Sequence, residues 1–266
     1  TVHILFVTIF FSTLHAKKLD DYNNGKNISN YFTGILLLQD NNYEESYNFL
    51  KKLEGLEEGH VDFSSRYLFS LINSGKFNEA FNYSRKLERI SKSNFESELV
   101  MGIYYLEKQN YDLAQKFFLK LKNRDSKIIL NNFISNALYN WASFNKLDFK
   151  KSQSIINNDD SNFFENLKKI QNVFLHCYYK SEQTEYHFSN LVSDKRVDFS
   201  RYNYFYASHL LRFNKTNDAK KVIDEALQKF PRNLILNQLR QDLENSKFKN
   251  NFNCQNLSNV IAEVLY

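Results

Sequence analysis

Residues 41–53 read NNYEESYNFLKKL, and the chain repeats this pattern twice at a constant spacing. Residues 75–87 read GKFNEAFNYSRKL and residues 109–121 read QNYDLAQKFFLKL, so each copy begins 34 residues after the previous one. Aligned copies share an aromatic column (Tyr43, Phe77, Tyr111), a small column (Ser46, Ala80, Ala114) and a leucine column (Leu53, Leu87, Leu121). A fixed period near 34 residues is typical of stacked helical hairpins, and it predicts an all-α solenoid.

The composition also favours a chain that is almost entirely helical. Of the 266 residues only one is proline and six are glycine, which argues against β-sandwiches, glycine-rich phosphate loops and long disordered linkers. Hydrophobic residues make up 42%, enough to fill the interfaces between successive hairpins. The formal net charge is +5, and acidic residues alternate with basic ones along the chain. We therefore expect solvated helix faces and no nucleic-acid partner.

The first 16 residues, TVHILFVTIFFSTLHA, have the character of a targeting segment. Their apolar run, residues 4–11, is too short to span a bilayer as a helix. The run is followed by a small residue, Ala16, at a place that suits cleavage by a signal peptidase, and then by the polar residues 17–26. Because the chain begins with Thr1 and no basic segment precedes the run, we interpret residues 1–16 as a truncated signal peptide and residues 17–26 as a linker.

This interpretation predicts a location in the periplasm or the cell envelope, with membrane contact only through the signal segment. Two alternatives stay open for residues 1–16. They could form an ordinary buried first helix of a cytoplasmic protein, or they could be part of a membrane anchor.

Helical hairpins are predicted from residue 27 onward. In the first, residues 28–40 place apolar side chains at helical spacing, Asn41 and Asn42 form the turn, and residues 43–53 form the second helix. The next two hairpins begin near residues 61 and 95. Small residues are required where two helices cross closely, because a larger side chain would hold the backbones apart. The residues that meet this requirement are Gly34, Ala80, Gly102 and Ala114.

These positions resemble the tetratricopeptide repeat family. Its 34-residue pattern has a small residue at position 8, an aromatic near 17, alanine at 20, a large apolar residue near 24 and proline near 32. Residues 199–233 match most completely, with Ala207, Ala219, Ile223, Ala226 and Pro231 at the expected places. Residues 133–166 match after an insertion of about four residues that brings Phe149 and Ser152 into register, and residues 167–199 match more weakly.

The resemblance covers residues 27–233 and implies a right-handed superhelix of about six helix-turn-helix repeats. Residues 234–266 are then an incomplete seventh repeat. A solenoid normally ends with a capping helix that has a polar outer face, whereas this chain stops on an apolar run. We therefore expect the chain to be a piece of a longer protein.

Motifs for catalysis or for binding a cofactor are not found. The sequence has no HExxH, GxxxxGK, GxSxG or CxxC motif. His176, Cys177 and His187 do not form a convergent metal set, because adjacent side chains on a helix diverge by about 100° and a fourth ligand is missing. We expect no catalytic residues, no metal and no small-molecule cofactor.

The two cysteines, Cys177 and Cys254, fall in repeats that are not adjacent. Units of a solenoid touch only their neighbours, whereas a disulfide needs two Cα atoms within about 7 Å. The sequence therefore predicts two free and mostly buried thiols.

The inner face of the predicted superhelix is the candidate binding surface. In the resembling family the first helix of each hairpin lines a concave groove that binds a peptide or a protein. Carried over by position, the candidate residues are Tyr31, Phe69, Trp141, Phe144, Tyr178, Tyr179, Arg201, Tyr204 and Arg212. Aromatic residues and arginine are enriched at the energetic centres of protein interfaces, and Trp141 is predicted to contribute most. The alternative is that several of these rings belong to the core between repeats.

The sequence thus predicts a non-catalytic scaffold or adaptor that binds a protein or peptide partner. One alternative is the superhelical part of a larger envelope enzyme, such as a lytic transglycosylase, with its catalytic domain beyond residue 266. Another is a structural solenoid that associates with itself.

Overall fold

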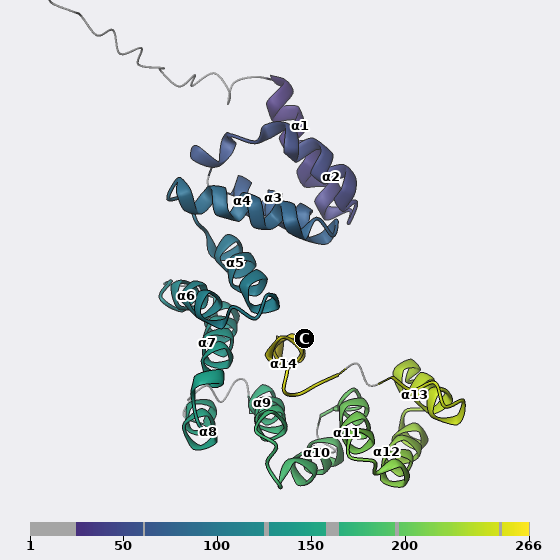
Figure 1. Cartoon of the computed structure of the whole chain (residues 1–266). Coiled ribbons are helices and arrows are strands. Elements are labelled where there is room, and N and C mark those ends of the chain that lie inside the picture. The colour runs from purple at the N-terminus through teal and green to yellow at the C-terminus, as the bar shows by residue number, and fades with distance from the viewer. Residues whose placement is uncertain are drawn as a thin grey trace, which may run out of the picture. The chain divides into compact units, whose positions relative to one another are not determined.

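The computed structural model describes residues 25–60, 62–124, 128–157, 165–194, 197–249 and 252–265, and every regular element in these ranges is a helix (Figure 1). The prediction of an all-α fold is therefore confirmed for this part of the chain. The predicted signal peptide, and the predicted linker up to residue 24, lie outside the described residues. Among the helices that are described, none is both long enough and apolar enough to cross a membrane.

The helices follow one another in pairs that are joined by short turns. The pairs are α1 (Gly25–Gln39) with α2 (Tyr43–Leu50), α3 (Phe63–Asn73) with α4 (Phe77–Arg89), α5 (Phe95–Glu107) with α6 (Tyr111–Lys122), α7 (Ile129–Ser143) with α8 (Phe149–Asn157), α9 (Glu165–Tyr178) with α10 (Thr184–Ser193), and α11 (Tyr202–Arg212) with α12 (Thr216–Lys229). Two single helices follow, α13 (Leu234–Glu244) and α14 (Leu257–Leu265). Short 3-10 helices occur at Lys51–Leu53, Leu56–Glu58 and Phe144–Lys146.

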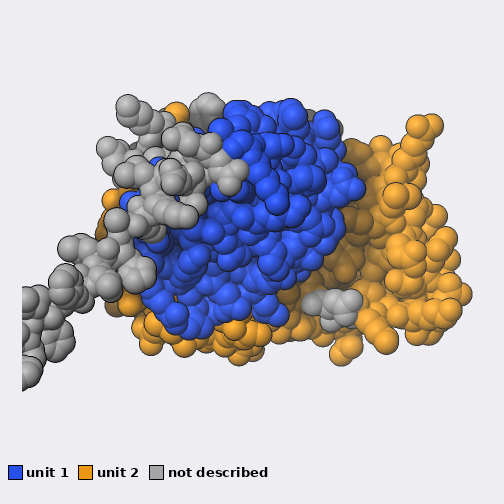
Figure 2. Space-filling model, turned by 90° about the horizontal axis from the view of Figure 1, so that it is seen from above, with its two compact units in different colours: residues 1–97 blue, residues 98–266 orange. Residues whose placement is uncertain are grey.

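The structure divides into two compact units, which are coloured separately in Figure 2. Unit 1 is residues 1–97 and unit 2 is residues 98–266, so that the boundary falls within α5. In unit 1, helices α1 to α4 pack on one another in chain order. In unit 2, α6 packs on α7, α8 packs on α9, and α9 to α13 pack in chain order. Each of the helices α1 to α4 and α6 to α13 thus finds its main partner next to it in the sequence.

The turns inside the hairpins share one backbone conformation. Asn41, Gly75 and Gln109 have φ values of 59, 71 and 56° and stand 34 residues apart, as do Lys180 and Asn214 with 54 and 59°. After each left-handed residue the next amide donates to a carbonyl five residues back, as in Asn42 N to Leu37 O, Lys76 N to Leu71 O and Asn110 N to Tyr105 O, each 2.8 Å. This Schellman arrangement satisfies carbonyl groups that a helix end would leave without partners. The repeat is therefore encoded in the turns as well as in the helices.

The small and leucine columns of the repeat are buried, as their predicted role requires. The small residues Ser46, Ala80 and Ala114, and their counterparts Ser152 and Ala219 in later hairpins, are all fully buried. The leucines Leu53, Leu87 and Leu121 are buried as well. In the first hairpin the Ser46 hydroxyl donates a hydrogen bond to the backbone carbonyl of Gly34 at 2.8 Å. Helices α1 and α2 therefore approach closely at the point where both residues are small.

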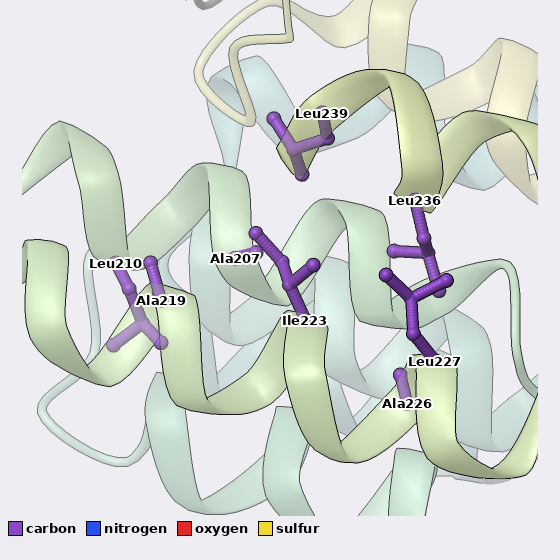
Figure 3. Packing of buried hydrophobic residues seen from close by; sticks show 8 residues of the cluster. All are labelled: Ala207, Leu210, Ala219, Ile223, Ala226, Leu227, Leu236 and Leu239. Carbon is purple, nitrogen blue, oxygen red and sulfur yellow. The ribbon is translucent and has the colours of Figure 1, made fainter. Parts of the chain in front are cut away.

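The sixth hairpin shows how the column residues build a core. Alanines from α11 and α12 allow these helices to approach, while larger side chains of α12 and α13 close the cluster (Figure 3). The cluster consists of Ala207, Leu210, Ala219, Ile223, Ala226, Leu227, Leu236 and Leu239. Burial of the leucine and isoleucine side chains of the cluster contributes about 1.5–3 kcal/mol each. Helix α13 therefore continues the packing of the hairpins before it.

The fourth hairpin departs from this pattern at its turn. Helix α7 ends in the 3-10 helix Phe144–Lys146 instead of a left-handed residue, and Leu147 is extended with φ −110° and ψ 156°. The hydroxyl of Tyr179 lies 2.8 Å from the carbonyl oxygens of both Phe144 and Leu147. The Phe144 carbonyl also accepts from Leu147 N at 3.2 Å, so a side chain of the next hairpin adds to the hydrogen bonding of the changed turn, at the place where the sequence has its insertion.

Helix α14 does not continue the stack. A further repeat would have placed it beside α13, but its principal neighbours are α7 and α9 (Figure 1). Residues 257–265, which the sequence analysis assigned to an incomplete seventh repeat, instead return to earlier helices of the same unit. This return creates the site described next.

Candidate functional site

The C-terminal segment, defined here as residues 252–265, is bound to unit 2 through one apolar helix face. Leu257, Val260 and Ile261 of α14 are buried, and their i, i+3, i+4 spacing places them on one side of the helix. At nine residues α14 is shorter than a helix that is stable alone in water. Its helical structure therefore depends on docking against α7 and α9.

One polar contact fixes the far end of α14. The guanidinium of Arg201 forms a two-point bond with the carboxylate of Glu263, with Nε to Oε2 at 3.0 Å and Nη2 to Oε1 at 3.0 Å. Arg201 also lies over the ring of Phe205, 5.5 Å from its centroid. Both charged side chains are more than two-thirds buried. A partly desolvated two-point pair is among the stronger hydrogen-bonded contacts of proteins, and it sets the direction of the bound helix.

Other polar contacts hold the residues that lead into α14. Arg212 donates to the side chains of Asn253 and Gln255, the latter at 3.0 Å. Gln255 in turn donates to the carbonyl of Cys177 at 2.9 Å, and the Ser258 hydroxyl donates to the carbonyl of Leu106 at 3.1 Å. The segment is therefore bound by side chains and by main-chain carbonyls along its length.

A covalent bond joins the same segment to α9. Cys177 and Cys254 form a disulfide across 77 residues of sequence, with Cα atoms 5.6 Å apart. The prediction of two free thiols was wrong. It assumed that helices meet only their sequence neighbours, whereas the chain after α13 returns to α9 and brings Cys254 into range.

Three of the predicted groove residues lie at this site. Arg201 and Arg212 bind the C-terminal segment, and Tyr204 packs its ring edge-on against Phe205 at 5.3 Å. Arg201, Tyr204 and Phe205 border a pocket of about 660 Å³ between the start of α11, α13 and the C-terminal segment. Its other lining residues are Leu234, Ile235, Gln238, Leu239, Asp242, Phe248, Lys249, Phe252, Asn259 and Glu263. This volume falls in the range of ordinary ligand pockets.

The structure places Trp141 and Phe144 in the core. Trp141 has 0% and Phe144 1% of its surface exposed, and their ring centroids are 5.0 Å apart. The indole Nε1 of Trp141 donates to Gln171 Oε1 on α9 at 3.1 Å. The Trp141 side chain therefore joins α7 to α9, and both rings are buried, which corrects the surface position that we predicted for them.

The remaining predicted residues are placed separately. Tyr178 is half-buried with its ring 4.9 Å from that of Tyr179, and the Tyr179 hydroxyl supports the end of α7 as described above. Tyr31 and Phe69 belong to unit 1, where Tyr31 packs on His60 with ring centroids 4.7 Å apart and Phe69 is 49% exposed. None of the polar contacts of the C-terminal segment described above involves Tyr31, Phe69, Tyr178 or Tyr179.

Sequence reasoning missed the segment side of the site. Asn253, Cys254, Gln255 and Glu263 were not binding candidates, because residues 234–266 were interpreted as an incomplete seventh repeat. A signal was present in the second cysteine, since two cysteines that follow a predicted signal peptide commonly form a disulfide.

Two histidines near the disulfide are unusually close. His176 is buried, its ring stacks on that of His187 with centroids 3.8 Å apart, and its Nδ1 lies 3.0 Å from the Ser181 hydroxyl. Burial, with a smaller contribution from His187, lowers the pKa of His176 to about 4. Among the described residues no three His, Cys, Asp or Glu side chains gather as a metal site.

We expect unit 2 to lose stability as the pH falls from about 6.5 toward 4. In the folded state the pKa of His176 is about 4, whereas in the unfolded chain it returns to about 6.5. Between these values the unfolded chain binds more protons, so lowering the pH favours unfolding by roughly 1.4 kcal/mol per unit, or about 2 kcal/mol at pH 5. Urea unfolding monitored by Trp141 fluorescence at pH 7.5 and pH 5 measures this loss. His176→Gln should reduce this loss, and the remainder is expected from His187 and His209, because burial lowers the pKa of both. An unchanged pH dependence in that variant would contradict the assignment.

Comparisons with known proteins give no match, either to a protein-family model or to a curated protein. What the chain does must therefore be inferred from its own residues.

Proposed function

We propose that this protein is a non-catalytic scaffold of the tetratricopeptide type, a right-handed superhelix that binds a helical segment of a partner protein. The binding surface is the face of unit 2 that α7, α9 and the start of α11 present to the C-terminal segment. One observation supports this most directly: the face already holds a peptide segment, residues 252–265, although that segment belongs to the same chain.

The chemistry of the bound segment describes what this face recognises. It accepts an apolar stripe, here Leu257, Val260 and Ile261, and it pairs a carboxylate with Arg201. An amphipathic helix laid into a groove is a recurrent mode of recognition, read through anchors at i, i+3 and i+4. Arginine is enriched among the residues that contribute most to such interfaces. We infer that the partner is an amphipathic helix with an acidic residue near one end.

The disulfide supports a location outside the cytoplasm. Disulfides persist in oxidising compartments such as the periplasm and are rare where thiol reductants are abundant. The Cys177–Cys254 bond therefore agrees with the interpretation of residues 1–16 as a truncated signal peptide. We propose the periplasm or the cell envelope as the place where the scaffold acts.

A labelled peptide of residues 252–265, with serine in place of Cys254, tests binding at this face. The recipient is the full-length chain carrying Cys177→Ala, Cys254→Ala and Val260→Asp, since an aspartate at the buried Val260 position weakens docking of the chain's own segment. We expect saturable binding by fluorescence anisotropy. Because a hydrogen-bonded ion pair with a charged partner is worth about 1.5–3 kcal/mol, adding Arg201→Gln should weaken binding at least about tenfold.

Matched changes show whether the effect is specific. Glu263→Gln in the peptide should weaken binding about as much as Arg201→Gln in the protein, and the two together should add little, because both remove the same pair. Arg240→Gln changes an exposed arginine of α13 that bonds within its own helix, and it should leave binding unaffected. Absence of saturable binding by a recipient whose circular dichroism is that of the parent chain would overturn the proposal.

A further inference from the structure

We propose that the Cys177–Cys254 disulfide is a redox latch: it keeps the C-terminal segment in its groove while oxidised, and its reduction by a dithiol releases the segment. The inference rests on the proposed function in one respect: release of the segment exposes the same groove that is proposed to bind a partner. In the latched state α14 occupies that surface itself.

The position of the bond suits a latch. Cys254 precedes the first buried residue of α14, Leu257, by three positions, and Cys177 lies in the last turn of α9. On its other side the segment is joined to α13, which ends at Glu244. The disulfide therefore anchors the entry of the segment beside Phe252, whose ring packs on those of Phe174 and Phe205 with centroids 5.6 and 4.6 Å apart. Beyond this point the described residues of the segment are held by the apolar face of α14 and by side-chain bonds.

The energetic effect of the bond on docking can be stated as a population ratio. Without it, the C-terminal segment has no covalent link to α9 whenever α14 leaves the groove. With it, a loop of about ten residues stays closed, and closure of such a loop shifts the ratio of docked to undocked segment by about a hundredfold. Undocking also melts α14, because so short a helix is not stable alone.

The surroundings of the bond allow a small reductant to reach it and favour its cleavage. The sulfur-bearing residues are 3% and 4% exposed, but both line a pocket of about 260 Å³. Lys180, His209, Arg212 and Lys215 line the same pocket, and His209 Nδ1 lies 3.6 Å from the Cys177 Sγ atom. Glu182 and Glu185 line the pocket as well, and Lys215 is paired with Glu185 at 2.6 Å. The group placed to stabilise a Cys177 thiolate is therefore the His209 imidazole beside its sulfur, which makes Cys177 the better leaving group.

The opening reaction is a thiol–disulfide exchange. A thiolate of the dithiol attacks the Cys254 Sγ atom, the S–S bond breaks, and Cys177 leaves as a thiolate beside His209. The second thiolate of the reductant then attacks the mixed disulfide and releases Cys254. The dithiol is oxidised to a disulfide by two electrons, and two protons end on the cysteine sulfurs.

Hydrogen–deuterium exchange on the full-length chain, with and without dithiothreitol, tests the latch. In the oxidised protein we expect the amides of residues 257–265 to be protected. After reduction they should exchange about a hundredfold faster and well ahead of the amides of α11 and α12. The variant with both Cys177→Ala and Cys254→Ala should show the fast exchange from the start and should not respond to dithiothreitol.

Two outcomes would overturn the latch. In one, mass spectrometry shows that the bond is reduced, yet residues 257–265 exchange no faster than before. In the other, these residues lose protection only together with α11 and α12, so that the bond is a general stabiliser of unit 2. Peptide binding is not measured in this experiment, so its failure is distinct from failure of the groove proposal.

Discussion

Replacing Cys177 and Cys254 together with alanine should lower the free energy of unfolding of unit 2 by about 4 kcal/mol. The disulfide closes a loop of 77 residues, and the chain-entropy treatment gives a stabilisation of that size for such a loop. The effect acts mainly on the unfolded chain, which gains freedom when the cross-link is absent. Urea unfolding monitored by Trp141 fluorescence is the appropriate measurement, because the only tryptophan is buried inside unit 2.

The reduced natural chain supplies the control for this prediction. In the presence of dithiothreitol its unfolding curve should shift to lower urea and approach that of the double variant, while the variant itself should not respond to the reductant. A difference below about 1 kcal/mol between the oxidised chain and the double variant would show that the cross-link does not constrain the unfolded chain.

Gly102→Ala should destabilise unit 2 by about 3 kcal/mol, opposite in sign to the usual effect of this change within a helix. Alanine is normally favoured over glycine there by about 1 kcal/mol. At Gly102, however, an added Cβ would lie 2.6 Å from Cδ1 of the Phe118 ring, and Phe118 is fully buried. The ring cannot move away without disturbing its own packing, so α5 and α6 must separate, which is the ordinary penalty of overpacking.

Two comparisons make the Gly102 prediction specific. Gly34→Ala in unit 1 would meet Leu50 Cδ2 at 2.7 Å and Cγ at 2.8 Å, and Leu50 is fully buried as well, so this change should also destabilise. Adding Phe118→Leu to Gly102→Ala should recover part of the lost stability by making room for the new methyl group. If urea unfolding shows Gly102→Ala to be as stable as the natural chain, the close approach of α5 and α6 at this point is incorrect.

The parts of the fold that could be predicted are those in which contacting residues are close in sequence. The two helices of a hairpin lie within about 34 residues of each other in the sequence. The small residues Ser46, Ala80 and Ala114, which recur at this period, therefore mark the points where the two helices cross. Arg201 and Arg212 were candidates for the same reason, since their position on the first helix of a hairpin follows from the repeat register. The burial of Trp141 was not predictable in this way, because it depends on Gln171 and Tyr178 of the next hairpin, where the register is weakest.

For the C-terminal segment, the sequence by itself determined that a helix forms and which face is apolar. The spacing of Leu257, Val260 and Ile261 shows that this face must pack on another apolar surface. It does not show which surface, because α13 and α9 could both cover the same apolar stripe. Only the tertiary structure decided that choice, by returning the chain after α13 so that Glu263 meets Arg201 and Cys254 meets Cys177. The physical reason is that hydrophobic burial is non-directional, whereas an ion pair and a disulfide form only between groups that the whole fold has brought within a few ångströms.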